Sequence, residues 1–220
     1  MKYGELKIEC MAVMDEMNEP ITMKTLEGFE SDESYKDLFA RMPGAINRAM
    51  DRMANKKKLP IKECKLTNPE KKGGYFVFDL SAVADYRSAK RIEFVSGNTV
   101  IDDVEFAQEG KKVRIFAGYN GELTLYYYPK APAVSADMEN ESEIEIPDEL
   151  ARIIPYYVKS DLMTRDEPGL ATQARNKFEE ALDEINLNEE DWFGETIKKD
   201  YRIEWLWDLI QMLVQTQKKA

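Results

Sequence analysis

The spacing of hydrophobic residues changes twice along the chain. Apolar side chains recur at helical spacing in residues 3–58, alternate with polar ones in residues 59–128, and return to helical spacing from residue 147. Helical spacing indicates amphipathic helices, and alternation indicates half-buried strands. We therefore predict an α+β fold: a helical bundle of about four to five helices, with an antiparallel β module inserted between its second and third helices.

Two helical blocks precede the β module. The first is predicted over residues 3–18, and residues 19–30 are expected to form a connector. Ser31 is a suitable N-cap for the second block, because acidic residues follow it at once and favour a helix N-terminus. Pro43 interrupts this block, so two helices that meet at the proline and one kinked helix fit equally well.

The β module is predicted over residues 59–131. Short alternating runs separated by glycine and asparagine turn signals predict six or seven strands. Strands of this length and number are typical of a small sandwich or barrel, and the pattern does not choose between the two. Asn120-Gly121 is a strong hairpin signal, so residues 112–116 and 122–128 are expected to pair as antiparallel neighbours.

An acidic linker leads from the β module back to helices. Pro147 opens a helix predicted over residues 147–163, Pro155 should bend it, and the next helix is predicted over residues 170–185. The predicted domains are the helical bundle of residues 1–58 and 147–186, the β module of residues 59–131, the linker of residues 132–146 and a C-terminal extension of residues 187–220.

The C-terminal extension ends in a strongly amphipathic helix, predicted over residues 201–217. Such a helix either closes its own core or docks on a partner. The polar residues 186–199 before it favour docking, because they would let the helix move away from the body. The candidate docking residues are Ile203, Trp205, Leu206, Trp207, Ile210, Leu213 and Val214, of which Trp205 lies off the main apolar stripe.

Candidate catalytic groups are few. The chain has no histidine, which excludes Ser-His-Asp and Cys-His mechanisms and most zinc sites, and it lacks the glycine-rich loops that bind phosphates. Cys10 and Cys64 are widely separated and are predicted to be small core residues. We therefore expect a protein that is not an enzyme and that holds no cofactor or metal.

The chain also lacks the segments that direct a protein to or across a membrane. Its apolar runs fall short of the roughly 20 residues that a membrane span needs. The N-terminus has no apolar stretch of the kind that signal peptides carry. An intracellular origin, without membrane association, is the expectation.

The net charge of −11 is concentrated in the C-terminal part of the chain. Residues 1–58 carry 10 basic and 11 acidic residues and residues 59–131 carry 11 and 10, whereas residues 132–220 carry 10 and 21. A protein that binds nucleic acid by its phosphates needs a concentrated basic face, which the sequence does not show. The alternating glutamates of residues 139–145 could hold a divalent cation, but in a Ser/Asn-containing linker they favour a solvated face.

Several segments of the chain resemble the head–tail connector (neck adaptor) proteins of tailed bacteriophages. These segments are YYYPKAP at residues 126–132, IPDE at residues 146–149, the polar turn at residues 165–169, the helix over residues 171–178 and MPGAINRAMDRMA at residues 42–54. What these segments share with the family is the positions of helix N-termini and of apolar residues, and they contain no catalytic motif. The large β module departs from the family pattern.

The resemblance implies a structural virion protein. Family members assemble as rings, commonly of twelve copies, between the portal and the tail, and the genome passes through without specific binding. The implied partners are other copies of the chain, the portal protein and a tail or nozzle protein, and the implied location is the virion neck after synthesis in the host cytoplasm. An acidic lumen would repel DNA phosphates, so we expect Glu179, Glu180, Asp183 and Glu184 to line the channel.

Two other function classes fit the same residues. A non-enzymatic cytoplasmic binding or regulatory module would present the β module to a protein ligand. A metal-dependent hydrolase with an acidic site would use Asp102 and Asp103.

Overall fold

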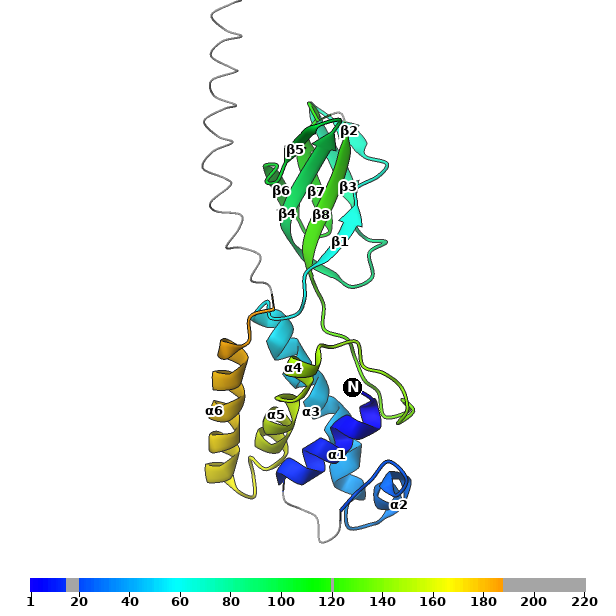
Figure 1. Ribbon diagram of the computed structural model, residues 1–220, viewed down its shortest axis with the longest axis vertical. Helices are drawn as coiled ribbons and strands as arrows, with labels where there is room; N and C mark the ends of the chain where they lie inside the picture. Colours follow the sequence, from blue (N-terminus) through cyan, green and yellow to red (C-terminus); the bar gives the residue numbers. More distant parts are fainter. Residues whose placement is uncertain (15–19, 120, 188–220) are drawn as a thin grey trace, which may run out of the picture. The chain divides into compact units, whose positions relative to one another are not determined.

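The computed structural model describes residues 1–14, 20–119 and 121–187. Figure 1 shows an α+β arrangement in which the strands are inserted between α3 and α4, which confirms the predicted fold class. The helices are α1 (Tyr3–Met14), α2 (Leu26–Ser31), α3 (Lys36–Asn55), α4 (Asp148–Ala151), α5 (Ile154–Leu162) and α6 (Pro168–Glu184). The strands are β1 (Lys62–Lys65), β2 (Glu70–Lys72), β3 (Tyr75–Asp79), β4 (Tyr86–Ser96), β5 (Thr99–Ile101), β6 (Phe106–Glu109), β7 (Lys112–Phe116) and β8 (Glu122–Pro129).

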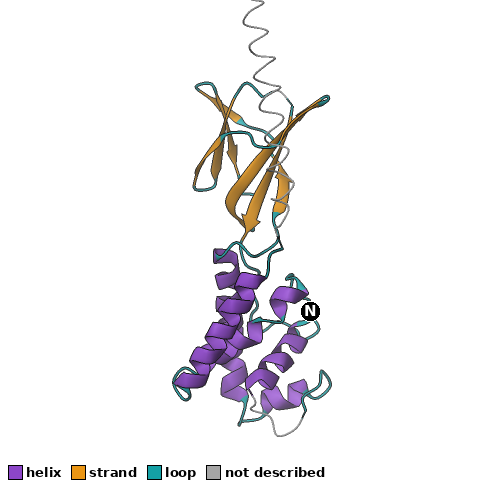
Figure 2. Cartoon of the chain, turned by 60° about the vertical axis from the view of Figure 1, so that its left-hand side comes forward, coloured by secondary structure: helices purple, strands orange, loops and turns teal. Residues whose placement is uncertain are grey.

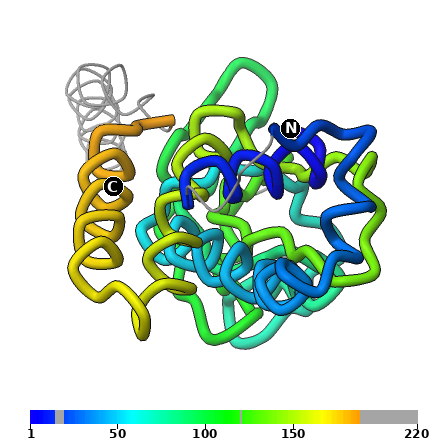
Figure 3. The backbone as a smooth tube through the Cα atoms, turned by 90° about the horizontal axis from the view of Figure 1, so that it is seen from below, coloured from blue at the N-terminus to red at the C-terminus, as the bar shows by residue number. Residues whose placement is uncertain are grey.

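Helix α5 lies at the centre of the helical body, which we define as α1–α6 with the linker that precedes α4. It packs against α1, α3 and α6, and Figure 3 shows α6 at the edge of this body. The core contains fully buried side chains from helices that are far apart in the sequence, such as Leu6, Met50, Val158 and Phe178. Burial of such apolar surface is the main force that holds the helices together.

The N-terminal helices differ from the prediction in two places. The predicted connector contains most of α2, which ends at Ser31. The prediction of Ser31 as N-cap is wrong, because α3 begins at Lys36 with Tyr35 in the N-cap position. The carboxylate of Asp32 accepts a hydrogen bond from the Ser34 backbone N–H at 2.8 Å, which stabilises a turn between α2 and α3. Pro43 lies inside α3, so a single helix spans the proline and the alternative of two helices that meet there is wrong.

The predicted bend at Pro155 is a full interruption. The helix expected over residues 147–163 is divided into α4 and α5, with Arg152 and Ile153 between them. Pro155 lies in the first turn of α5, where its missing N–H leaves no helical hydrogen bond unmade.

The β module consists of two four-stranded antiparallel sheets (Figure 2). Their strand orders are β1-β8-β4-β5 and β2-β3-β7-β6, and each order ends in strands paired on one side only, so the sheets do not close into a barrel. Alternate side chains of both sheets form one buried cluster that includes Phe78, Ile92, Ile115 and Leu125. The structure therefore shows a sandwich, and the described residues form eight strands in place of the six or seven predicted.

The predicted hairpin between residues 112–116 and 122–128 is wrong. Strand β7 pairs with β3 and β6, whereas β8 pairs with β1 and β4, so the chain crosses from one sheet to the other between them. Gly121 serves this crossing by close approach: a Cβ atom there would lie 2.4 Å from the backbone oxygen of Val95. A glycine is therefore needed at this position because the backbone passes close to β4, and not because a two-residue turn is present.

Candidate functional site

Two of the four predicted channel residues take part in ion pairs between α3 and α6. The Glu179 carboxylate accepts hydrogen bonds from Arg52 Nε at 2.9 Å and from Arg52 Nη2 at 3.0 Å, and Lys56 Nζ lies 2.9 Å from its second oxygen. Lys56 Nζ also lies 2.7 Å from Asp183 Oδ1. The hydrogen bond from Arg52, with a further contribution from Lys56, lowers the pKa of Glu179 below its usual range.

The other two predicted channel residues face solvent. Glu180 and Glu184 are exposed on α6 and form no recorded ion pair with the described residues. Helix α6 therefore carries two kinds of carboxylate: Glu179 and Asp183, which pair with basic residues of α3 and its C-terminal end, and Glu180 and Glu184, which are exposed and form no ion pair with the described residues. Of these four residues, only Glu180 and Glu184 place carboxylates without an ion-pair partner on the exposed face of α6.

The predicted docking residues lie outside the described part of the chain. Ile203, Trp205, Leu206, Trp207, Ile210, Leu213 and Val214 all fall in residues 188–220. Their role in docking stays a prediction.

The acidic linker is fixed to the helical body along its length. Asn47 of α3 donates from Nδ2 to the Val134 backbone oxygen at 2.8 Å and accepts from the Val134 N–H at 2.8 Å. The backbone oxygens of Asn140 and Ser142 accept the N–H groups of Gly4 and Tyr3, both at 2.8 Å. These bonds satisfy donors at the N-terminus of α1 that have no partner within the helix.

Side-chain burial in the linker follows a period of two. Ile144 and Ile146 are buried in the helical core, whereas Glu139, Glu141, Glu143 and Glu145 are exposed. The linker also lies close to α1: a Cβ at Gly4 would lie 3.0 Å from the Asn140 Cβ and 2.8 Å from the Met23 sulfur. The linker is therefore part of the packed helical body, and its glutamates are solvated.

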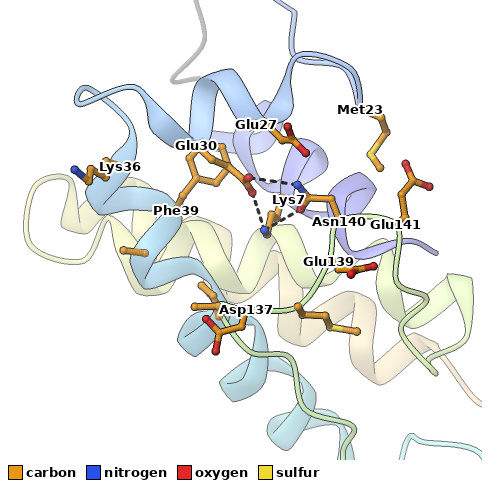
Figure 4. A pocket seen from close by; sticks show the side chains of 14 residues that line it. Lys7, Met23, Glu27, Glu30, Lys36, Phe39, Asp137, Glu139, Asn140 and Glu141 are labelled. Carbon is orange, nitrogen blue, oxygen red and sulfur yellow. Dashed lines mark hydrogen bonds and ion pairs between the residues drawn. The ribbon is translucent and has the colours of Figure 1, made fainter.

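A charged network joins α1, α2 and the linker (Figure 4). Lys7 is only 6% exposed, and its Nζ donates to Glu30 Oε1 at 2.7 Å and to Asn140 Oδ1 at 2.9 Å. The amide of Asn140 also donates to Glu30, at 3.3 Å. Sequence reasoning missed this network; the available signal was a lysine directly after Leu6 on the apolar face of α1.

The cysteines and carboxylates give no sign of catalytic chemistry in the described residues. Cys10 is buried, and burial raises the pKa of its thiol, so the thiolate that would act as nucleophile or ligand is disfavoured. Cys64 is half-buried, and burial raises its pKa as well. Within the ranges that the structure describes, no group of three or more Cys, Asp or Glu side chains could hold a metal ion.

Comparison with known families identifies the class of protein. The sequence profile of the SU10 adaptor protein family matches residues 1–198, which span both helical parts and the β module. The chain belongs to this family. A comparison with curated proteins gave no match.

Membership of the SU10 adaptor family gives the chain the structural role of a phage adaptor, and it confirms the resemblance seen in the sequence. The matched residues include the whole β module. In the part of the chain that the structure describes, no helix has the length and apolar character needed to cross a bilayer.

Proposed function

We propose that the protein is a head–tail connector of the virion neck, which forms a ring between the portal and the tail and lets the genome pass. The observation that carries this proposal is the match to the SU10 adaptor family over residues 1–198. A ring of twelve copies is the number that the resemblance implies. The tail or nozzle protein is the proposed partner on the opposite side from the portal.

The proposed contact with the portal is the helix predicted over residues 201–217. This segment lies beyond the matched residues 1–198, so the proposal for it rests on its apolar stripe and on the polar residues 186–199 that precede it. Tryptophan and aliphatic side chains at helical spacing are the usual anchors when a helix binds in a groove. Trp207, Ile210 and Val214 would be the central anchors of this helix.

The proposed channel lining is the acidic face of α6. Glu180 and Glu184 support it best, because both are exposed and carry uncompensated charge. Glu179 and Asp183 contribute less, since Arg52 and Lys56 neutralise much of their charge. A lumen with net negative charge would repel DNA phosphates and let the duplex slide.

Mass measurement of the protein mixed with its portal protein tests the proposal. We expect the full chain to form a multi-copy complex with the portal, and a chain that lacks residues 200–220 to lose portal binding while its circular dichroism spectrum retains the helices and strands of the body. Normal portal binding by the truncated chain would exclude the docking role of residues 201–217. A full chain that neither associates with the portal nor forms an oligomer beside it would overturn the connector proposal itself.

A further inference from the structure

The surface of the helical body has a cavity of about 680 Å³, open to solvent, that no part of the proposed function uses. Four segments line it: α1 at Lys7, residues 23–30 including α2, the first two turns of α3, and residues 136–141 of the linker. Figure 4 shows Lys7 between Glu30 and Asn140, with Glu27, Asp137 and Glu139 placed around the same space. The cavity is thus formed where the linker crosses the N-terminal helices.

The two lysines of the cavity are already engaged. Lys7 is nearly buried and bonds to Glu30 and Asn140, so its charge is compensated within the protein. Lys36 lies 2.9 Å from the carboxylate of Glu33. An anionic ligand would therefore find only Lys36, which is exposed and weakly paired, and would meet several carboxylates.

The carboxylates of the cavity are in excess. Glu30 is used by Lys7, and Glu141 lies 2.5 Å from Lys2. Glu27, Asp137 and Glu139 line the cavity with no recorded ion pair to any described residue. The cavity therefore attracts a positive charge.

The remaining walls are apolar. Met23, Phe39, Pro43 and Met138 line the cavity together with the carboxylates. A bare metal ion does not match such walls, and no described set of carboxylates is arranged to hold one. A ligand that fits must have an apolar stem and a cationic end.

We propose that this cavity binds a lysine or arginine side chain carried by a partner protein. The four-carbon or three-carbon stem would lie against the methionines and Phe39, and the charged end would reach Asp137 and Glu139. We choose a basic side chain as the ligand because its positive charge complements the carboxylates that line the cavity. The bound side chain would hold the linker against α2 and α3, and so would fix the segment through which the β module is joined to the helices. This proposal uses only residues of the helical body, so it does not depend on the proposed assembly of the protein into a ring.

The test uses the full chain with ¹³C-labelled methionine methyl groups and butylguanidinium as the probe. The methyl signals of Met23 and Met138 report on the cavity, and those of Met50 and Met53, which are fully buried in the core, serve as the internal reference. We expect butylguanidinium to shift the two cavity signals in a saturable way and to leave the reference signals unchanged. Butanol, which shares the stem but lacks the charge, should shift them little.

The double variant Asp137→Asn/Glu139→Gln should bind the probe about fivefold more weakly, the effect of removing two solvent-exposed ion pairs. The matched control is Glu180→Gln/Glu184→Gln, which removes the same charge from exposed sites on α6 and should bind the probe as the unaltered chain does. Equal shifts with butanol, equal binding by the Asp137/Glu139 variant, or the absence of saturation would each overturn the proposal. If a rise in protein concentration alone shifts the Met23 and Met138 signals in the unaltered chain but not in that variant, the basic side chain comes from a second copy.

Discussion

Two buried tyrosines, Tyr127 and Tyr3, differ in what their hydroxyl groups meet. The Tyr127 hydroxyl donates to Asp85 Oδ1 at 2.9 Å, and burial together with this bond raises the pKa of Tyr127 to about 12. The Tyr3 hydroxyl is buried and has no hydrogen-bond partner among the described residues. A buried polar group costs free energy when it lacks a partner and contributes when it has one, and a charged partner strengthens the contribution.

Removal of the two hydroxyls should therefore have opposite effects. We expect Tyr127→Phe to lower the free energy of unfolding by about 1 kcal/mol, because Asp85 loses the Tyr127 hydroxyl as a donor and keeps only Lys62, 2.7 Å from its other oxygen. Tyr3→Phe is the matched control, since it removes the same atom without breaking a bond, and it should leave stability unchanged or raise it slightly. Denaturant titration of the three proteins measures the difference. Equal losses from both substitutions would contradict this account.

At the scale of single residues, sequence reasoning succeeded where a residue type has one usual environment. Cys10 and Cys64 were both expected in the core; Cys10 is buried there, whereas Cys64 is only half-buried. Lys7 was missed, because a lysine on an apolar face is compensated only by groups that the fold brings from elsewhere: Glu30 from α2 and Asn140 from the linker. Residue type predicts burial, but it does not predict the partner that makes the burial of a charge possible.

At the scale of elements, periodicity located most helices and strands but not their partners. Helix α2 has six residues, fewer than two turns, so it is too short to show a helical repeat. Strand pairing depends on contacts between segments far apart in sequence, such as β1 with β8, and no local signal encodes these. Gly121 illustrates the difficulty, because a glycine at a turn and a glycine at a close backbone approach have the same sequence signature.

The contact between α3 and α6 should make stability depend on pH through Glu179. Its folded-state pKa is lowered by Arg52 and Lys56, so the stability it contributes is present above its usual pKa of 4.5 and is lost as pH falls through the folded value. We expect Glu179→Gln to lower the free energy of unfolding by about 1 kcal/mol at pH 7, and the loss to shrink as pH falls below 4.5.

Glu180→Gln provides the control for this effect on the same helix. Glu180 is exposed and has no recorded ion pair in the described residues, so its substitution should change stability little at either pH. Denaturant titrations at pH 7 and at about pH 3 compare the two variants with the unaltered chain. A loss from Glu179→Gln that is the same at both pH values would show that the ion pairs do not contribute through the charge of this carboxylate.

At the scale of the whole molecule, the described chain contains two hydrophobic cores that share no residue. One core draws its buried residues from Tyr3 to Leu59 and from Val134 to Leu182, and the other draws them from Leu66 to Tyr127. Each core is assembled from its own elements, so the cohesion of one does not require the other. The division into domains made from the sequence follows the same two groups of residues, and it stays a prediction until unfolding is measured.

Calorimetry of the full chain should resolve two unfolding transitions, one for each core. Tyr127 belongs to the β module and Glu179 to the helical body. Tyr127→Phe should therefore lower the midpoint of one transition by about 4–8 °C, and Glu179→Gln should lower only the other, by a few degrees. Residues 59–131, expressed alone, should unfold at the midpoint that Tyr127→Phe shifts, because their core is complete without the helices. A single transition that both substitutions shift would mean that the two cores unfold as one cooperative unit. The β module would then not be an independent insertion, and a partner bound to either part would stabilise both.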